Sequence, residues 1–161
     1  MRGLYIHVPF CLRKCPYCDF YSVSYDEGLA GRYARAVVRN IRAYGGEFDS
    51  VYFGGGTPIL AATKIGGILG AVIFTQNAEI TVECNPCEMT EETLQTLLEA
   101  GVNRLSVGVQ SLDDRVLEAL GRRHDARTAE NAIITAKKAG FGNISADIML
   151  ATPRQLNLSP V

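Results

Sequence analysis

Three cysteines stand close together near the start of the chain, in the stretch HVPFCLRKCPYCDF (residues 7–20). Cys11, Cys15 and Cys18 are separated by three and then two residues, so their thiolates can wrap one side of a compact cluster. A [4Fe–4S] cube normally takes about four cysteines, and a site with only three leaves one iron open for a ligand from outside the protein. The alternative is structural zinc held by the same thiolates and His7, but zinc sites usually pair two CxxC knuckles across a longer stretch. The spacing therefore favours an iron–sulfur cluster.

The remaining composition is that of a soluble protein in a reducing compartment. The chain has 161 residues and a formal net charge of −1, with acidic and basic residues interleaved, which argues against a nucleic-acid partner. Its most apolar run, residues 65–74, is about half the length that a transmembrane segment needs, and no secretory signal precedes the cysteines. We therefore expect a cytoplasmic protein, in which a count of five cysteines points to metal binding or catalysis more than to disulfides.

Short apolar runs alternate with longer amphipathic ones along the chain. We expect strands at 4–8, 51–53, 79–84, 104–109 and 144–149, and helices at 29–44, 90–100, 111–120 and 126–139. Thr90 is the expected N-cap of the second helix, Ser111 and Asp114 resemble a capping box for the third, and Gly140 ends the fourth. This alternation predicts an α/β fold, a partial (β/α) TIM-type barrel of parallel strands that is truncated after about five strands. An open doubly wound sheet is the alternative.

The residues that could do chemistry fall at the carboxyl ends of these strands, where such barrels carry their active sites. The cysteines follow the first strand, and GGGTP (54–58), whose glycines allow close approach of a ligand, follows the second. Glu83 ends the third strand and is suited to hydrogen-bonding a ribose hydroxyl or an amino group. Gln110 and Asp147 lie at the ends of the fourth and fifth strands. This coincidence predicts one site at one rim of the barrel.

The string CLRKCPYC fits the CxxxCxxC signature and resembles that of radical S-adenosylmethionine (SAM) enzymes. The wider string LYIHVPFCLRKCPYCDF, together with YFGGGTP, ITVECNP, EAGVNRLSVGVQSLDDRVLEALGRRH and AGFGNISADIM, resembles the group of oxygen-independent coproporphyrinogen III oxidases and heme chaperones. The likeness implies that the open iron chelates the amino and carboxylate groups of SAM. One electron then cleaves SAM to methionine and a 5′-deoxyadenosyl radical, chemistry that belongs to the cofactor.

The resemblance also implies roles for individual residues. Arg122, rather than its neighbour Arg123, would hold the SAM carboxylate with its planar guanidinium, and two tyrosines would help to seat SAM. The full expected SAM-binding set is Tyr5, Tyr17, Gly55, Gly56, Thr57, Glu83, Gln110, Arg122 and Asp147. His7 either packs beside the cluster or takes part in proton transfer. Cys84 is expected to pack as a small hydrophobe and Cys87 to lie in a loop.

One departure distinguishes branches within the group. Phe20 stands where true coproporphyrinogen oxidases carry a further cysteine, which favours the heme-chaperone branch. Oxidative decarboxylation of coproporphyrinogen III is the alternative activity. Either branch implies heme or a porphyrin as partner and an electron donor such as flavodoxin or ferredoxin.

The likeness covers residues 3–152 and fades in the tail 153–161, at the end of LATPRQLNLSPV. We therefore expect residues 1–161 to form an incomplete radical SAM core that lacks the rest of the barrel, and turnover by this chain alone is not expected. A non-functional fragment and a zinc-stabilised binding module are the competing interpretations.

Overall fold

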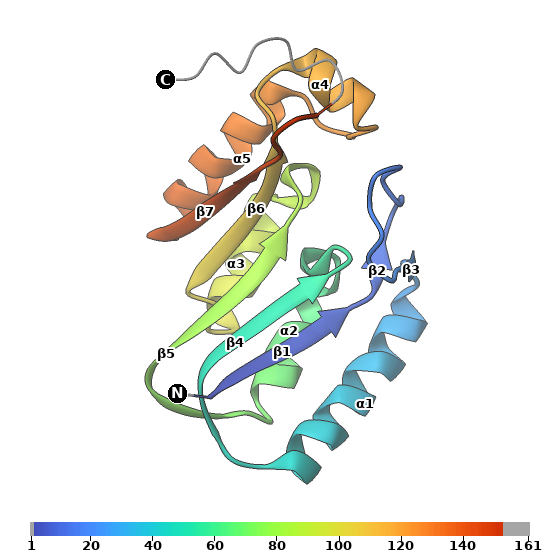
Figure 1. Cartoon of the computed structure of the whole chain (residues 1–161). Helices are drawn as coiled ribbons and strands as arrows, with labels where there is room; N and C mark the ends of the chain where they lie inside the picture. The colour runs from blue at the N-terminus through green and yellow to red at the C-terminus, as the bar shows by residue number, and fades with distance from the viewer. Residues whose placement is uncertain (1, 153–161) are drawn as a thin grey trace.

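A curved sheet of five parallel strands forms the centre of the computed structural model, which describes residues 2–152 (Figure 1). Its strands lie in the order β1-β4-β5-β6-β7, and every neighbouring pair is parallel. Their bounds are Gly3–Val8 (β1), Glu47–Gly55 (β4), Ile73–Cys84 (β5), Arg104–Gln110 (β6) and Asn143–Ile148 (β7). Because the spatial order follows the chain order, each connection is a single crossover, as in a TIM-type barrel. The predicted partial barrel is confirmed.

Helices cover one face of the sheet. α1 (Glu27–Tyr44), α2 (Ala62–Leu69), α3 (Glu91–Glu99) and α5 (Ala126–Ala139) pack side by side in that order. The short helix α4 (Asp114–Ala119) lies near the carboxyl ends of the strands, at the top of Figure 1. Two 3-10 helices, η1 (Pro58–Ala61) and η2 (Pro86–Glu88), follow β4 and β5.

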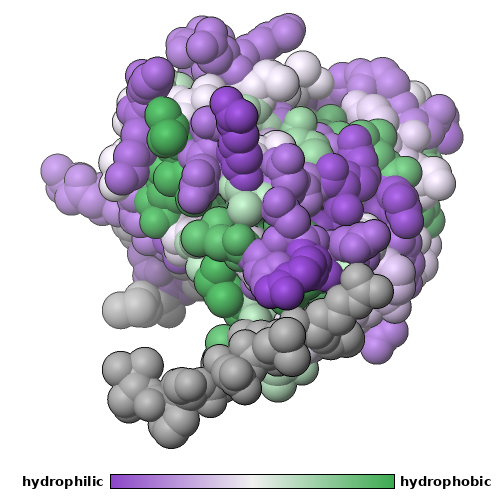
Figure 2. Space-filling view, turned by 90° about the horizontal axis from the view of Figure 1, so that it is seen from above, coloured by the Kyte–Doolittle hydropathy of each residue, from purple (hydrophilic) through white to green (hydrophobic). Residues whose placement is uncertain are grey.

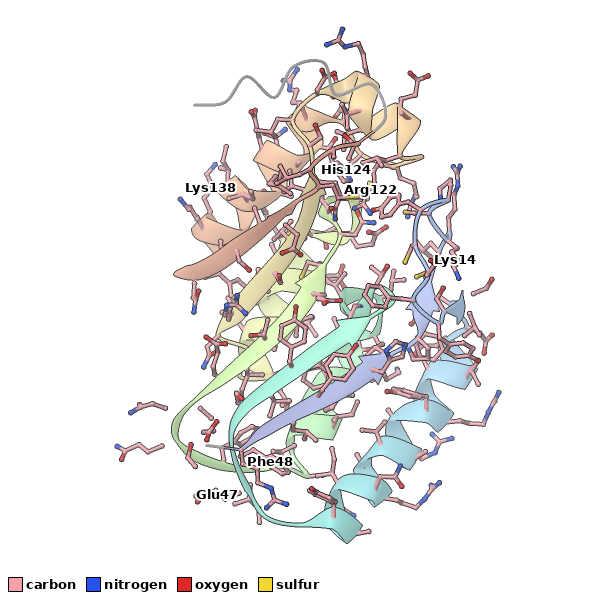
Figure 3. All side chains as sticks on the ribbon, viewed as in Figure 1. Lys14, Glu47, Phe48, Arg122, His124 and Lys138 are labelled. Atoms are coloured by element: carbon pink, nitrogen blue, oxygen red, sulfur yellow. The ribbon has the colours of Figure 1, made fainter. Side chains whose placement is uncertain are left out.

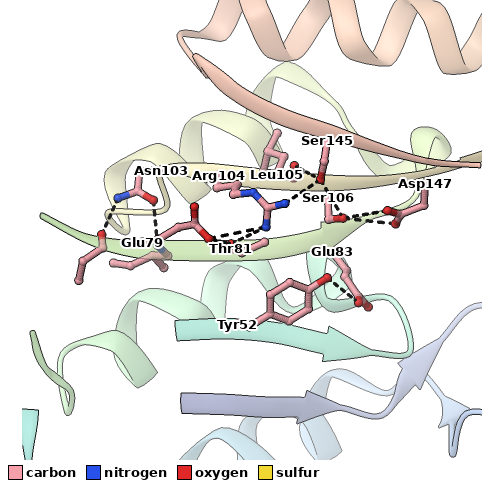
Figure 4. A network of polar contacts seen from close by, with 12 residues as sticks. Tyr52, Glu79, Thr81, Glu83, Asn103, Arg104, Leu105, Ser106, Ser145 and Asp147 are labelled. Atoms are coloured by element: carbon pink, nitrogen blue, oxygen red, sulfur yellow. Dashed lines mark hydrogen bonds and ion pairs between the residues drawn. The ribbon is translucent and has the colours of Figure 1, made fainter. Parts of the chain in front are cut away.

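The two faces of the sheet differ in polarity because side chains alternate along each strand. Val51, Phe53, Val82 and Leu105 point toward the helices and are fully buried in the hydrophobic core. The opposite face, which we call the inner face, is polar and hydrogen-bonded across the strands (Figure 4). On this face the Arg104 guanidinium donates to side-chain oxygens on β5 and β7. The core therefore lies between sheet and helices, and the inner face is left for polar chemistry.

Most of the predicted helix ends are confirmed. The Thr90 hydroxyl accepts a hydrogen bond from the Thr93 amide, and the Thr90 amide donates to the Thr93 hydroxyl, so α3 begins with a capping box. α5 ends at Gly140, which adopts a φ of 118° that residues other than glycine rarely adopt. No helix within residues 2–152 is long and apolar enough to cross a membrane.

The expected capping box at α4 was wrong. Asp113 is the N-cap, and its carboxylate accepts from the Arg115 amide at 2.9 Å. Ser111 instead accepts a hydrogen bond from the Asp113 amide at 3.0 Å and supports the turn before the helix.

The sequence prediction also missed some elements and shortened others. It did not include α2 or the small ribbon of β2 (Phe10–Cys11) and β3 (Val23–Ser24), and β4 and β5 begin earlier than expected. Residues 153–161, the predicted atypical tail, lie outside the described part of the chain.

Candidate functional site

A cavity of about 290 Å³ opens at the carboxyl ends of the strands. Viewed from this end, the surface is largely hydrophilic and includes a smaller hydrophobic area (Figure 2). The loop that carries Lys14 faces Arg122 across the top of the sheet (Figure 3). All three N-terminal cysteines and eight of the nine expected SAM-binding residues line the cavity: Cys11, Cys15, Cys18, Tyr17, Gly55, Gly56, Thr57, Glu83, Gln110, Arg122 and Asp147.

Two of the cysteine sulfurs accept hydrogen bonds within this cavity. The Thr57 hydroxyl donates to Cys11 Sγ at 3.7 Å, and Arg122 Nη1 donates to Cys15 Sγ at 3.6 Å. The Cys18 amide donates to the Cys15 carbonyl at 3.1 Å and closes a turn. Through this turn the Cys18 thiol also faces the cavity. Thr57 and Arg122 thus fix the positions of two of the three sulfurs in the cavity.

His7, the fourth ligand of the zinc alternative, already has a partner at each ring nitrogen. Nε2 lies 2.9 Å from the Tyr21 carbonyl, which can only accept, so Nε2 carries the hydrogen. Nδ1 then accepts from the Tyr5 hydroxyl at 3.2 Å. No three His, Cys, Asp or Glu side chains among residues 2–152 are arranged to hold a single metal ion. A cubane places its thiolates on different irons, so it does not require convergence on one point.

The glycine turn after β4 is locked against the cysteine loop. The Gly56 amide donates to Val8 O at 2.9 Å, and the Thr57 amide donates to Phe10 O at 2.7 Å. A Cβ on Gly56 would lie 2.6 Å from that same Phe10 carbonyl oxygen, closer than real Cβ contacts come. The absence of a side chain at Gly56 therefore permits this approach of the two loops.

Glu83 is held by two donors from the neighbouring strand. Tyr52 donates to Oε1 at 2.9 Å, and the Gly55 amide donates to Oε2 at 3.0 Å. Burial, followed by the charge of Glu83, raises the pKa of Tyr52 to about 12, so this phenol stays protonated and remains a donor. Carboxylate oxygens accept more than one hydrogen bond each, so Glu83 keeps capacity for a ligand hydroxyl or amine.

Gln110 and Asp147 are placed by an irregularity at the ends of β6 and β7. The register between these strands shifts between Gly108 and Gln110, and Gln110 has a φ of 67°. Such a backbone costs free energy for a residue with a side chain and is found mostly where function requires it. A Cβ on Gly108 would lie 2.9 Å from Gln110 Nε2. The Asp147 carboxylate accepts from the Ser106 hydroxyl at 3.3 Å.

The structure separates Arg122 from Arg123. Arg122 Nη2 donates to Gly108 O at 2.8 Å and Nη1 to the Tyr17 hydroxyl at 3.2 Å, so the guanidinium reaches into the cavity. Arg123 instead forms an ion pair with Glu88, with 2.6 Å between Nη1 and Oε1. Arg122 is therefore the one of the two that faces the site.

The two expected aromatic residues are not equivalent. Tyr17 lines the cavity, and burial raises its pKa although Arg122 opposes the shift. Tyr5 does not line the cavity. Its side chain is 57% exposed, its ring stacks on Tyr52 with 6.1 Å between centroids, and its hydroxyl contacts His7. The structure thus places Tyr5 outside the cavity lining, although it lies near Glu83: burial, followed by the charge of that carboxylate, raises the pKa of Tyr5.

Cys84 is buried in the hydrophobic core at 5% exposure, and its Sγ donates to Val82 O at 3.5 Å. Burial raises the pKa of this thiol, which fits the expected small hydrophobe. Cys87 lies in the 3-10 helix η2 rather than in an irregular loop, and partial burial raises its pKa too.

Several lining residues were missed in the sequence. Ser106 and Gly108 share the face of β6 that carries Gln110, and Asn85 follows Glu83 by two positions, so strand alternation pointed to them. The others are Arg13, Lys14, Phe20 and Met149, for which no periodic pattern exists in the sequence. Cys84, which was expected only to pack as a small hydrophobe, also borders the cavity.

Comparison with known proteins bears on this geometry. The family model described as the radical SAM superfamily matches residues 5–156. Radical S-adenosyl methionine domain-containing protein 1, mitochondrial, of Bos taurus is 38% identical over 95% of this chain and 37% of its own length. Heme chaperone HemW of Lactococcus lactis is 34% identical over 96% of this chain and 42% of its own length.

A solved structure, that of the radical SAM enzyme coproporphyrinogen III oxidase (HemN) from Escherichia coli, superposes with a TM-score of 0.82 at 27% identity. It matches 95% of this chain, which corresponds to 38% of that protein. The chain thus spans less than half the length of these relatives. With a family model that matches nearly the whole sequence and a cysteine-lined cavity at the expected rim, the chain belongs to the radical SAM superfamily.

Proposed function

We propose that this chain binds a [4Fe–4S] cluster through Cys11, Cys15 and Cys18, and binds SAM beside it in the 290 Å³ cavity. The single observation that carries the proposal is that these three thiols, far from the strand-end residues in sequence, line one cavity with them. Membership of the radical SAM superfamily supports the binding of both the cluster and SAM.

The residues present fit these groups. Arg122 lines the cavity, and its planar guanidinium presents N–H donors of the kind that pair with a carboxylate. At Gly56 the backbone closely approaches the Phe10 carbonyl in the cysteine loop, and a side chain at this position would block that approach. Cys11, Cys15 and Cys18 provide the soft sulfur donors that iron–sulfur clusters require. When bound, the cluster supplies the electron for reductive cleavage of SAM.

Each side chain then has a task toward SAM. The Arg122 fork would pair with the carboxylate of SAM, and the carboxylates of Glu83 and Asp147 would accept from its hydroxyl or amino groups. Tyr17 lines the cavity and would contact SAM there. Gln110 offers both a donor and an acceptor at the strand end.

We further propose a role in heme metabolism of the heme-chaperone type. Support comes from the curated relatives named heme chaperone and from Phe20, which lines the cavity, is 65% exposed and cannot act as a fourth sulfur ligand. The alternative is coproporphyrinogen III oxidation, which the similarity to the HemN structure favours. Heme titration followed in the Soret region, and decarboxylation of coproporphyrinogen III with SAM and a reductant, distinguish the two.

The electron donor and the compartment also belong to the proposal. A redox protein such as flavodoxin or ferredoxin is the expected electron donor, and the cytoplasm is the expected location. The Bos taurus relative is named as mitochondrial, so the location can differ within the group.

Anaerobic reconstitution with iron and sulfide tests the ligand assignment. We expect about four irons per chain, lost when Cys11, Cys15 and Cys18 are replaced together by alanine. Replacing Cys84 and Cys87 is the matched control and should leave iron content unchanged. Zinc without iron in protein purified without oxygen would instead support the zinc-binding module.

A further inference from the structure

Every buried side-chain nitrogen or oxygen without a hydrogen-bond partner in residues 2–152 lies in two short segments beside the cavity. The atoms are Asn85 Oδ1, Glu88 Oε2, Arg122 Nε and His124 Nδ1. Two of them follow β5, and two belong to the loop between α4 and α5. Buried polar groups nearly always have a hydrogen-bond partner. Four unpartnered atoms in these two segments therefore call for a functional explanation.

Three consecutive residues of the α4–α5 loop are anchored to different parts of the chain. Arg122 reaches into the cavity. Arg123 pairs with Glu88, whose side chain is only 10% exposed. His124 is buried, and its Nε2 donates to Val109 O at 3.0 Å. Both anchors directly follow Arg122 along the chain, so they fix the C-terminal side of the backbone from which its guanidinium extends.

Glu88 also meets Arg122 across a small second space. This space, about 10 Å³, is bordered by Asn85, Glu88 and Arg122. It has room for about one water molecule, which can donate to two acceptors and accept from a donor. Those are the roles that Asn85 Oδ1, Glu88 Oε2 and Arg122 Nε leave open. Glu88 is thus connected to Arg122 through Arg123 and through this space.

We propose that Glu88 is a positioning residue that holds the Arg122 guanidinium in the orientation that receives the carboxylate of SAM. The proposal rests on the proposed function, which assigns SAM to the cavity. Glu88 does not line that cavity itself, so it acts through Arg122 and Arg123.

A comparison of two ligands tests the proposal on the anaerobically reconstituted chain. For Glu88→Gln, we expect the Kd of SAM to rise about tenfold, as when a charge-assisted hydrogen bond loses its alignment. The Kd of 5′-methylthioadenosine, which lacks the amino-acid carboxylate, should stay within about twofold because Arg122 does not contact it. Glu92→Gln, an exposed change on α3, is the control and should alter neither value.

Different outcomes overturn different statements. An equal loss of affinity for both ligands would show a merely structural role for Glu88, and unchanged SAM affinity would exclude any role. If the wild-type chain binds no SAM, it is the proposed function that fails. Arg123→Gln removes the same ion pair from its other side, and it carries the test if Glu88→Gln does not fold.

Discussion

Replacing Gly56 by alanine should loosen the contact between the glycine turn and the cysteine loop. The new Cβ would lie 2.6 Å from the Phe10 carbonyl oxygen, and ordinary contacts begin at 3.4 Å, so this oxygen would have to retreat by about 0.8 Å. The other close atoms, at 2.9 and 3.0 Å, are also backbone atoms of Phe10, so no side chain can swing away. That retreat stretches the 2.7 Å hydrogen bond from the Thr57 amide beyond useful length.

The cost follows from these contacts. Overpacking of a tight site costs about 1–3 kcal/mol, and the weakened hydrogen bond costs about 0.5–1.5 kcal/mol. Alanine restricts the unfolded chain and returns about 0.4–1 kcal/mol. We therefore expect the free energy of unfolding to fall by about 2–3 kcal/mol. Because the displaced segment leads directly into Cys11, cluster loading should fall as well.

Urea unfolding of the apo chain and iron content after reconstitution measure the two effects. Gly67→Ala is the matched control, because its Cβ would meet nothing within 4 Å and the position lies inside α2. We expect that control to be neutral or to stabilise by up to about 1 kcal/mol. If Gly56→Ala stays within about 0.5 kcal/mol of wild type with full iron, the turn does not constrain the cysteine loop and the reasoning is refuted.

Arg122→Lys should weaken SAM binding by about ten- to hundredfold, because an ammonium cannot reproduce the planar fork, and equal affinity by calorimetry would contradict its role. Cys84 should resist alkylation at pH 8 in the folded apo chain, since burial raises its thiol pKa and excludes reagent, and mass spectrometry showing fast labelling would count against its core position. Stability should fall as the pH rises from 10 to 12, because burial raises the pKa of Tyr33 and Tyr52 to about 12 while unfolded tyrosine titrates near 10. The raised pKa makes this contribution complete below about pH 10, so identical urea midpoints at pH 9 and pH 11 would contradict it.

The strand ends could be predicted because their signals are local. Alternating apolar residues and glycine stops define β5, β6 and α5 without knowledge of the rest of the chain. α2 was missed because its sequence ATKIGGIL contains two glycines, which weaken a helix on its own. Burial of Ile65 and Ile68 against the core supplies the stabilisation, and no window of sequence shows that contact.

In the site, too, some residues have local sequence signals and others depend on contacts between distant parts of the chain. Glu83, Gln110 and Asp147 were found because they end strands of one parallel sheet. The preference for Arg122 over Arg123 came from resemblance alone, since adjacent arginines look alike in sequence. Its physical reason is Glu88, which is distant along the chain and engages Arg123. Tyr5 was likewise expected from resemblance, but it contacts His7 and does not line the cavity, and no motif encodes that contact.

The electron paramagnetic resonance spectrum of the reduced, anaerobically reconstituted chain, recorded with and without SAM, tests the central claim most directly. We predict a [4Fe–4S] signal whose shape changes when SAM is added, because the iron without a cysteine ligand takes up the added molecule. A signal that SAM leaves unaltered, or no cubane signal at all, would contradict the assignment of Cys11, Cys15 and Cys18 and of the cavity beside them.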